Sequence, residues 1–556
     1  MLSLVLVVFA QEVPGASAFF VLFWRAVQRP GSEQTSRKSR ATPHSPLQLS
    51  APLLLSHLSI LPLIPPAAAD KAMWIVTAYT FLYALSVVAT GALCVVSQLP
   101  APVRSTRSYR WNAVIAATLI TEFPQIFLGL KFLILYFASA AGVLDPATGL
   151  SGVQWLYRLD IAVFLIIWGF FLQSYFARFV VEEQTKMYRA VDSHDPPGFF
   201  HLGYWFRLLN PFWSARNVMV HPDICYATDA ELKHAGPAAE PYMSLDVHIH
   251  PSYPRNRPIL IYVHGGSWSS GDKTVTPPFI SYMALKRWVV VSVNYRLSPD
   301  AKYPDHLIDL KRAIRWVRQH AVRYGGDPNF IAVAGNAAGG HLAAMAAMTA
   351  NDPYYQPGFE SVNTEVQACV GMNAVLDVTN HKKYWRHKFQ EWFATNIAGV
   401  EGGFANNEEA MHVASPVVLL KRMEAERRKS IKTAAVGGPD LAAVETELEK
   451  DAEVKVSAAG TSGPRPVTGL EQLPPFLLFH GRADMLVPFR SARDFVQSFK
   501  KISKSPICYV EFPNANHMYE ILSAPRAHYM AYGIERFLNR MYERHVAAAG
   551  EKVDLK

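Results

Sequence analysis

The stretch FIAVAGNAAGGHLAAMAAMTA, residues 330–350, decides the fold of the larger part of this chain. Its first five residues, Phe330–Ala334, are all apolar, which is typical of a strand buried on both faces. Small residues from His341 to Ala350 favour a helix that packs closely. Glycines at 335, 339 and 340 flank the turn between them, where they allow backbone conformations that other residues avoid. Strand, sharp turn and helix in this order predict one crossover of a parallel α/β sheet.

Around this stretch, short apolar runs alternate with amphipathic ones from about Tyr242 onward. A helix is expected at Pro304–Tyr324, because its apolar residues recur every three or four positions. Five further strands are expected at Ile259–Val263, Trp288–Val293, Val366–Val370, Phe476–Phe479 and Ile507–Phe512. We therefore predict an α/β domain over residues 242–548, with a doubly wound, mostly parallel sheet and helices on both faces.

One segment of this domain breaks the alternation. Residues 421–466 are rich in Glu, Lys, Ala and Gly and contain almost no aromatic residue. Such a composition buries too little apolar surface to form part of a core. It predicts a charged insertion, solvated and either helical or disordered, and favours a plain surface insertion over a lid.

Three apolar runs precede the domain. The first, Met73–Leu99, contains no charged side chain, and a helix needs about 20 apolar residues to cross a bilayer. The second, Phe123–Leu144, is interrupted by a single lysine, and the third is Ile161–Ala177. We predict three transmembrane helices within residues 73–181, followed by a linker at 182–241.

Basic residues indicate how these helices are oriented. Three arginines lie between the first two runs, at 104, 107 and 110, and three basic residues follow the third, at 178, 186 and 189. Positively charged loops stay on the cytoplasmic side. We expect an integral membrane protein whose α/β domain is cytoplasmic, in an endomembrane such as that of the ER.

The topology of residues 1–72 stays open. This region is apolar at Leu2–Trp24 and Ala51–Ala69, with a polar, basic stretch between the two runs. It lacks the basic start of a signal peptide. Either apolar run could add a crossing, and the sequence equally allows a true start at Met73.

The net charge of +9 at pH 7 bears on partners. Lys and Arg do not gather in a stripe interleaved with aromatic residues, so we expect no nucleic acid as a partner. A basic face near anionic lipid is the preferred interpretation, which makes membrane lipid the expected partner. The four cysteines, at 94, 225, 369 and 508, form no CxxC pair, so we expect neither a disulfide framework nor a zinc site.

Two segments carry residues suited to acyl-transfer chemistry. The segment HGGSW, His264–Trp268, follows an expected strand, and its glycines let backbone N–H groups approach and stabilise an oxyanion. The turn at 335–340 matches the nucleophile elbow G-x-S-x-G in its glycines, but its middle residue is Ala337. The N–H of Ala338 at the start of the helix remains as a further donor.

Asp484 and His517 complete the pattern. Each lies in a loop just after an expected strand. Taken singly, Asp484 could be a turn or cap residue, and His517 is one of 19 histidines. Their order is more informative, because elbow, acid and base follow one another along the chain as they do in α/β-hydrolases.

The stretch Tyr262–Ala344 resembles the HGG branch of the α/β-hydrolases, which includes hormone-sensitive-lipase-like carboxylesterases and the feruloyl-esterase-like group. The matching motifs are HGGSW (264–268), NYRLSPDAKYPDHLIDLKRAIRW (294–316), GNAAGGHLA (335–343), HGRADMLVP (480–488) and NANHMYE (514–520). The resemblance implies an eight-stranded α/β-hydrolase fold, carboxylic-ester substrates, and neither cofactor nor metal. By position it implies Asp484 as triad acid and His517 as triad base, with an oxyanion hole formed by Gly265, Gly266 and Ala338.

The chain departs from this pattern at two positions. Asn336 stands where Asp is usual, and Ala337 stands where the family has its nucleophilic serine. A methyl group has neither a lone pair nor a proton to give up, so no acyl-enzyme can form. No other G-x-S-x-G occurs, and nothing indicates elbow geometry for the serines at 267, 269 and 270.

These patterns predict a membrane-anchored hydrolase of carboxylesterase or lipase type that is inactive, or nearly so, and keeps a pocket for an ester or acyl small molecule. Two alternatives stay open. The chain could be a protein-interaction scaffold with an unknown partner, or a residual esterase acting on lipid or prenyl-type esters. The second alternative draws on the architecture, which also resembles that of the plant-type isoprenylcysteine methylesterases. Ala337 fits a natural pseudoenzyme and an engineered inactive form equally well.

Overall fold

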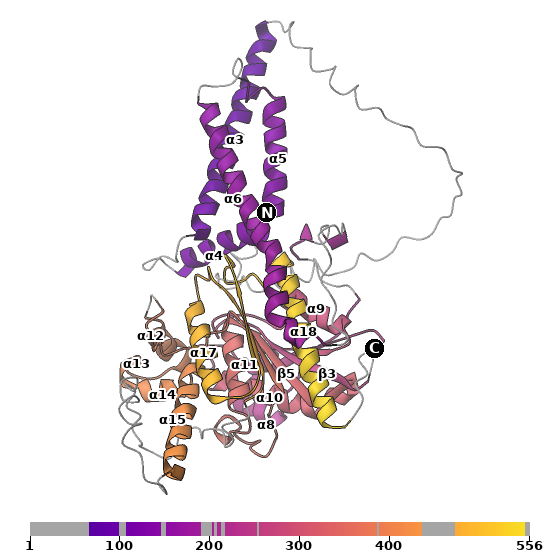
Figure 1. The fold of residues 1–556 in the computed structure, drawn as a ribbon, viewed down its shortest axis with the longest axis vertical. Coiled ribbons are helices and arrows are strands. Elements are labelled where there is room, and N and C mark those ends of the chain that lie inside the picture. Colours follow the sequence, from indigo (N-terminus) through magenta and orange to yellow (C-terminus); the bar gives the residue numbers. More distant parts are fainter. Residues whose placement is uncertain are drawn as a thin grey trace, which may run out of the picture. The chain divides into compact units, whose positions relative to one another are not determined.

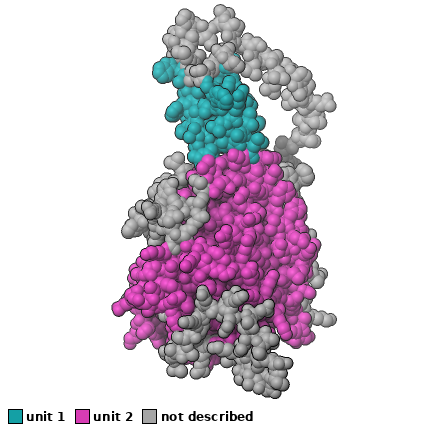
Figure 2. Space-filling view, turned by 60° about the vertical axis from the view of Figure 1, so that its left-hand side comes forward, with its two compact units in different colours: residues 1–92, 128–165 teal, residues 93–127, 166–556 magenta. Residues whose placement is uncertain are grey.

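A computed structural model describes the greater part of the chain (Figure 1). The described residues are 66–98, 107–145, 152–190, 203–204, 208–212, 217–252, 255–385, 388–435 and 473–550. The chain forms two compact units, which are coloured separately in Figure 2. One unit consists of residues 1–92 and 128–165, and the other of residues 93–127 and 166–556. The predictions for residues 1–65 fall outside the described part.

Two of the N-terminal helices are long and apolar enough to cross a membrane. They are α3 (Pro66–Gln98), which covers the first predicted run as far as Gln98, and α6 (Val153–Thr185), which contains the third. The second run behaves differently. Helix α5 (Pro124–Ala140) has only 17 residues and reaches the required length together with α4 (Arg107–Glu122), from which it is bent by 78°. Within the described residues, length and composition therefore allow two spans, or three if the bent pair is one span.

Proline explains where the second apolar run is divided. Pro124 has no N–H to donate and its ring is tolerated in the first turn of a helix, so α5 begins there. The predicted run Phe123–Leu144 therefore starts one residue early and extends beyond Ala140, the last residue of α5.

A buried ion pair joins α5 and α6 within the first unit. Lys131 contacts Asp160, and their side chains are 3% and 8% exposed. The hydroxyl of Tyr83 donates to Asp160 Oδ2 over 3.2 Å, and Lys131 Nζ donates to Thr90 Oγ1 over 3.2 Å. The lysine that interrupts the second apolar run is thus paired, as charges among apolar helices usually are.

The second unit contains an eight-stranded sheet with the order β1-β2-β4-β3-β5-β6-β7-β8. Strand β2 runs antiparallel to both of its neighbours, β1 and β4. All other neighbouring strands are parallel. The strands are β1 (Met219–Cys225), β2 (Ser244–Ile249), β3 (Arg257–Val263), β4 (Val289–Val293), β5 (Gly326–Asn336), β6 (Ala368–Met372), β7 (Phe476–Gly481) and β8 (Ile507–Phe512). Each predicted strand overlaps one of these, and β6 begins two residues later than predicted.

Helices cover both faces of this sheet, as the sequence predicted. Alternate residues of β3 point to opposite faces, so Ile261 packs in one core cluster and Tyr262 in the other. Among the described residues, the α-helices of this unit beyond α6 are α8 (Asp229–Ala235), α9 (Pro278–Leu285), α10 (Asp305–His320), α11 (Ala337–Met348), α12 (Phe389–Phe393), α13 (Gly403–Asn406), α14 (Glu408–His412), α15 (Pro416–Ala435), α17 (Phe489–Ile502) and α18 (Pro525–Ala548). Residues of α10, α11 and α17 pack on one face, and residues of α9 and α18 on the other.

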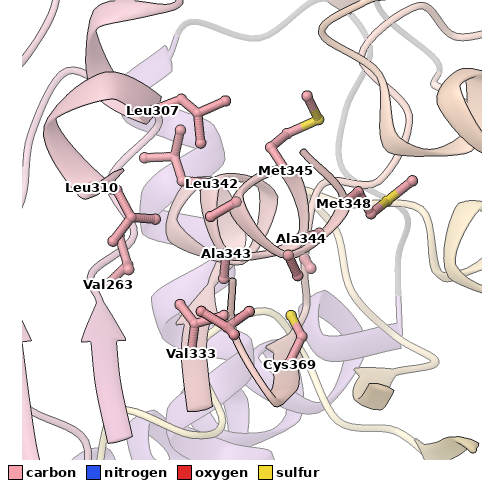
Figure 3. Packing of buried hydrophobic residues seen from close by; sticks show 14 of the residues in the cluster. Val263, Leu307, Leu310, Val333, Leu342, Ala343, Ala344, Met345, Met348 and Cys369 are labelled. Atoms are coloured by element: carbon pink, nitrogen blue, oxygen red, sulfur yellow. The ribbon is translucent and has the colours of Figure 1, made fainter. Parts of the chain in front are cut away.

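Helix α11 is the central element of the first cluster. Figure 3 shows Leu342 of α11 between Leu307 and Leu310 of α10 and the ends of β3 and β5. The twelve residues of α11 are all buried, and small side chains let it lie against the strands. This packing fixes the position of the turn that begins the helix.

Two predicted boundaries were wrong. The range 182–241 is not only a linker, because it contains β1 and α8, and β1 pairs with β2 as the edge of the sheet. Most of β1 is exposed and its sequence MVHPDIC has no apolar alternation, so no periodic signal marks it. Part of the predicted insertion 421–466 is the end of α15, whose Met423 is buried, and residues 436–466 lie outside the described part.

Candidate active site

The site begins at the turn between β5 and α11. Asn336 has extended backbone angles, and Ala337 follows with φ of +47°, in the left-handed region that non-glycine residues rarely adopt. A Cβ on Gly339 would lie 2.1 Å from the carbonyl oxygen of Val263, so only glycine fits there. The strand, the strained turn and the helix have the arrangement of a nucleophile elbow.

The residue at the tip of this elbow cannot act as a nucleophile. Ala337 is 8% exposed and carries only a methyl group, while its carbonyl oxygen accepts a hydrogen bond from the N–H of Val375 over 3.2 Å. The first N–H groups of a helix have no acceptor within it, and the side chain of Asn336 does not cap α11. The role of the Ala338 N–H in an oxyanion hole stays a prediction.

The predicted oxyanion loop lies against the elbow. Gly265 and Gly266 follow β3, and the Cα of Gly265 is so close to Asn336 that an added Cβ would lie 3.1 Å from its carbonyl oxygen. Gly266 has φ of +121°, and a Cβ there would lie 2.0 Å from the oxygen of Ser270. The backbone of Gly265 is thus close to Asn336, the residue before α11. An oxyanion hole at these glycines stays a prediction.

Asp484 and His517 form a hydrogen-bonded pair. His517 Nδ1 lies 2.8 Å from Asp484 Oδ2, and both side chains are buried. Asp484 Oδ1 accepts hydrogen bonds from the N–H groups of Leu486 and Val487, each over 2.8 Å. Burial alone would raise the pKa of Asp484, but the charge of His517 and hydrogen bonds to the carboxylate outweigh it and lower that pKa well below its ordinary value.

The pKa of His517 is raised above its ordinary value. Burial lowers it, but the carboxylate of Asp484 has the larger combined effect, through its charge and its hydrogen bond, so the pKa ends above its ordinary value. The side chain of Asn516 links the two loops, because its oxygen accepts from the N–H groups of His517 and Met485 over 2.7 and 3.3 Å. An imidazole held by a buried carboxylate is suited to take up a proton.

Sequence reasoning missed Glu520, which is fully buried three residues after His517. Its carboxyl group accepts from Asn336 Nδ2 over 3.3 Å and from Asn373 Nδ2 over 3.1 Å. Tyr262 donates to the oxygen of Asn336 over 3.0 Å, which fixes the orientation of that amide. The hydrogen bond from Asn336 to Glu520 therefore connects the residue before Ala337 with the loop that carries His517.

Burial raises the pKa of Glu520 to about 7, against the nearby charge of His517 and the hydrogen bond from Asn336, which lower it. An aspartate at 336, which the related esterases usually have, would place a second carboxyl group beside it. Asn336 therefore suits Glu520 better than aspartate would. Glu520 ends the matching motif NANHMYE (514–520), but the motif assigned it no role, because a glutamate after a loop is usually exposed to solvent.

Comparisons with known proteins show similarity to esterases. Residues 245–426 match the BD-FAE family model. The chain is 36% identical over 286 residues to the probable carboxylic ester hydrolase LipM of Mycobacterium tuberculosis, covering 51% of this chain and 54% of that protein. It is 30% identical over 317 residues to the esterase LipC of the same organism, covering 56% and 66%. The matches thus span between about half and two thirds of these relatives.

A solved structure of esterase B from Lactobacillus rhamnosis is also similar, with 14% identity and a TM-score of 0.45 over 68% of this chain and 99% of that one. The sheet order, the elbow and the acid–base pair define the class of the protein as an α/β-hydrolase. Within that class the chain resembles the carboxylesterases related to hormone-sensitive lipase.

Proposed function

We propose that this chain is a membrane-anchored pseudoesterase, which binds an ester or acyl group in a carboxylesterase site and does not hydrolyse it. The observation that carries the proposal is the methyl group of Ala337 at the tip of a left-handed elbow, in a chain that keeps the Asp484–His517 pair. The preceding residue, Asn336, donates a hydrogen bond to Glu520, three residues after His517. The backbone that holds a nucleophile is present, and the nucleophilic atom is not.

The chemistry of the missing step supports this. In an esterase with a triad, histidine takes the serine proton while the serine oxygen attacks the carbonyl carbon, and the oxyanion hole holds the developing charge. Here His517 has no hydroxyl group at 337 to deprotonate. Binding and an oxyanion hole alone retain about 10³–10⁴-fold acceleration over water, which is small beside an intact esterase.

Anchoring in a membrane is supported by the two helices that are long and apolar enough to cross it. Large apolar side chains on them are exposed, among them Trp74 at 74% and Leu165 at 61%. Such an apolar surface is stable against lipid and costly in water. The basic residues around the helices favour a cytoplasmic carboxylesterase domain, with lipid as the surrounding partner and as a source of acyl ligands.

The decisive experiment is Ala337→Ser in the full-length chain, purified in detergent and assayed on p-nitrophenyl acetate and butyrate. We expect the substitution to create hydrolysis that His517→Ala abolishes. Ala338→Ser is the matched control, since it places the same hydroxyl group one residue beyond the elbow tip, and it should give no activity.

Two results would contradict the proposal. If the unmodified chain hydrolyses either ester and loses this activity in His517→Ala, the protein is an esterase that acts without the serine. If a folded Ala337→Ser variant is inactive on short and long acyl esters, the assigned triad is wrong.

Binding is tested on the unmodified chain. Medium-chain fatty acids and non-hydrolysable acyl phosphonates should raise its melting temperature, because a ligand that binds only the folded state stabilises it. Widening the side chain at the elbow with Ala337→Leu should remove this shift. Ligand stabilisation that persists in Ala337→Leu would place acyl binding elsewhere.

A further inference from the structure

The loop that carries His517 is held by residues of the apolar N-terminal helices. Asn514, three residues before His517, has φ of +51°, and its side-chain amide donates to Gln173 Oε1 over 2.6 Å. Gln173 belongs to α6, one of the two helices apolar enough to cross a membrane. A polar side chain on such a helix needs a partner, and the partner here belongs to the base loop.

Arg526 holds the same loop from a second direction. This residue of α18 is fully buried, and its Nη2 donates to the carbonyl oxygen of Pro513, the first residue of the loop, over 3.1 Å. Its Nη1 donates to the carbonyl oxygen of Thr121 over 3.1 Å and to the carboxylate of Glu122 over 2.5 Å. Thr121 and Glu122 end α4, at the bend before α5.

The chemistry of these contacts argues against incidental packing. Glu122 and Arg526 are both 0% exposed, and burying two charges costs more than packing two apolar residues of similar size. A guanidinium group has donors in a fixed fork, so one side chain can bind α4 and the base loop at once in a defined geometry. Removing one partner of such a buried pair would leave the other charge buried and unpaired, so the two side chains hold each other in place.

We propose that Gln173 and Arg526 are positioning residues for His517. They bind Asn514 and Pro513, and so couple the apolar helices α4 and α6 to the loop that presents the base to Asp484. The apolar helices are then part of the site as well as an anchor. The proposal rests on the proposed function only in assigning a role to His517, and the experiment reads the state of His517 without any enzymatic activity.

The test uses the full-length chain in lipid nanodiscs and follows the proton on His517 Nδ1. A proton shared between a buried imidazole and a carboxylate gives an NMR signal downfield of the amide protons, and Asp484→Asn identifies this signal by removing it. The variants are Gln173→Leu, which removes the acceptor for Asn514, and Arg526→Lys, which keeps the charge and loses the fork. Asn514→Gly tests the first contact from the other side, because glycine keeps the left-handed backbone and removes the amide.

Matched controls exist on the same helices. Gln154→Leu makes the same change on α6 at a glutamine that contacts the carbonyl oxygen of Leu144. Arg536→Lys makes the same change on α18 at a buried arginine that pairs with Glu182 of α6. These controls should keep the signal of His517 as it is in the unmodified chain.

We expect Gln173→Leu, Arg526→Lys and Asn514→Gly each to speed exchange of the Nδ1 proton with water by about fivefold or more, since each removes a hydrogen bond that holds the loop closed. Deuterium exchange should rise in peptides that cover 513–520 and stay unchanged in peptides of β3 and β5. If the three variants keep the signal and its exchange rate, the proposal is wrong. It is equally wrong if Gln154→Leu and Arg536→Lys change the signal as much, because the effect would then be general loosening. Neither result would bear on Ala337→Ser, which tests the proposed function separately.

Discussion

The two halves of the site differ in what they have kept. The elbow half keeps its geometry, with Ala337 at φ of +47° and a glycine packed against β3, but has no reactive atom. The acid–base half keeps its chemistry, with His517 Nδ1 2.8 Å from Asp484 and the acid bound by two backbone N–H groups. The backbone geometry of the elbow is therefore present without a nucleophile, while the acid–base pair is complete.

The difference has a physical reason. The elbow is imposed by close packing of backbone on backbone, which does not depend on the side chain at its tip. The acid–base pair depends on buried polar groups that form hydrogen bonds with each other, and removing one leaves the other without its partner. A substitution at 337 therefore removes the attacking atom and leaves the rest of the site assembled.

The largest expected effect falls on the acid–base half once the nucleophile is restored. In the Ala337→Ser background, His517→Ala should lower kcat by about 10⁶-fold and Asp484→Asn by about 10⁴-fold, because the base moves the proton and the acid orients the base. Both are measured as p-nitrophenyl butyrate hydrolysis. Equal residual activity in Ala337→Ser and in its His517→Ala derivative would show that the two halves do not act together.

A substitution at Gly339 in the elbow should lower the free energy of unfolding. Gly339→Ala places a Cβ 2.1 Å from the carbonyl oxygen of Val263, so backbone has to move, and we expect the free energy of unfolding to fall by about 3–5 kcal/mol. Denaturant unfolding followed by tryptophan fluorescence measures this. Gly358→Ala is the control, since that glycine has φ of +81° with open space around it, and it should lose only about 1 kcal/mol. Equal losses would mean that packing does not hold the elbow.

Glu520 connects the two halves and should make stability depend on pH. Its pKa is about 7 in the folded chain against an ordinary value of 4.5, so between these values the folded state holds a proton that the unfolded state has lost. The free energy of unfolding should therefore fall as pH rises from about 5 to 7, by about 2–3 kcal/mol in total, and level off above. In Glu520→Gln this part of the slope should vanish, whatever the absolute stability. An unchanged slope would show that the carboxyl group is already ionised at pH 5.

The smallest effect concerns the strain at the elbow tip. Ala337→Gly relieves the left-handed conformation, and because glycine also gains entropy in the unfolded chain, the expected net gain is only about 0.5 kcal/mol. Ala343→Gly on the same helix should instead lose about 1 kcal/mol or more. Opposite signs in thermal unfolding would confirm that the alanine at 337 is held against its preference, and equal losses would contradict it.

The sequence by itself determined the elbow, the order of acid and base, and the strands from β3 to β8, because these are local patterns of apolar runs, glycines and loop residues. It also determined that no acyl-enzyme forms at 337, since an alanine side chain has the same chemistry in every fold. Only the tertiary structure decided the rest. Strand β1 is recognised only by its pairing with β2. Glu520 accepts hydrogen bonds from Asn336 and Asn373, which lie 184 and 147 residues away along the chain. The contacts of Gln173 and Arg526 with the loop of His517 are likewise visible only in the tertiary structure. The effect of a polar side chain depends on its burial and on its hydrogen-bond partners, and the neighbouring residues in the sequence determine neither.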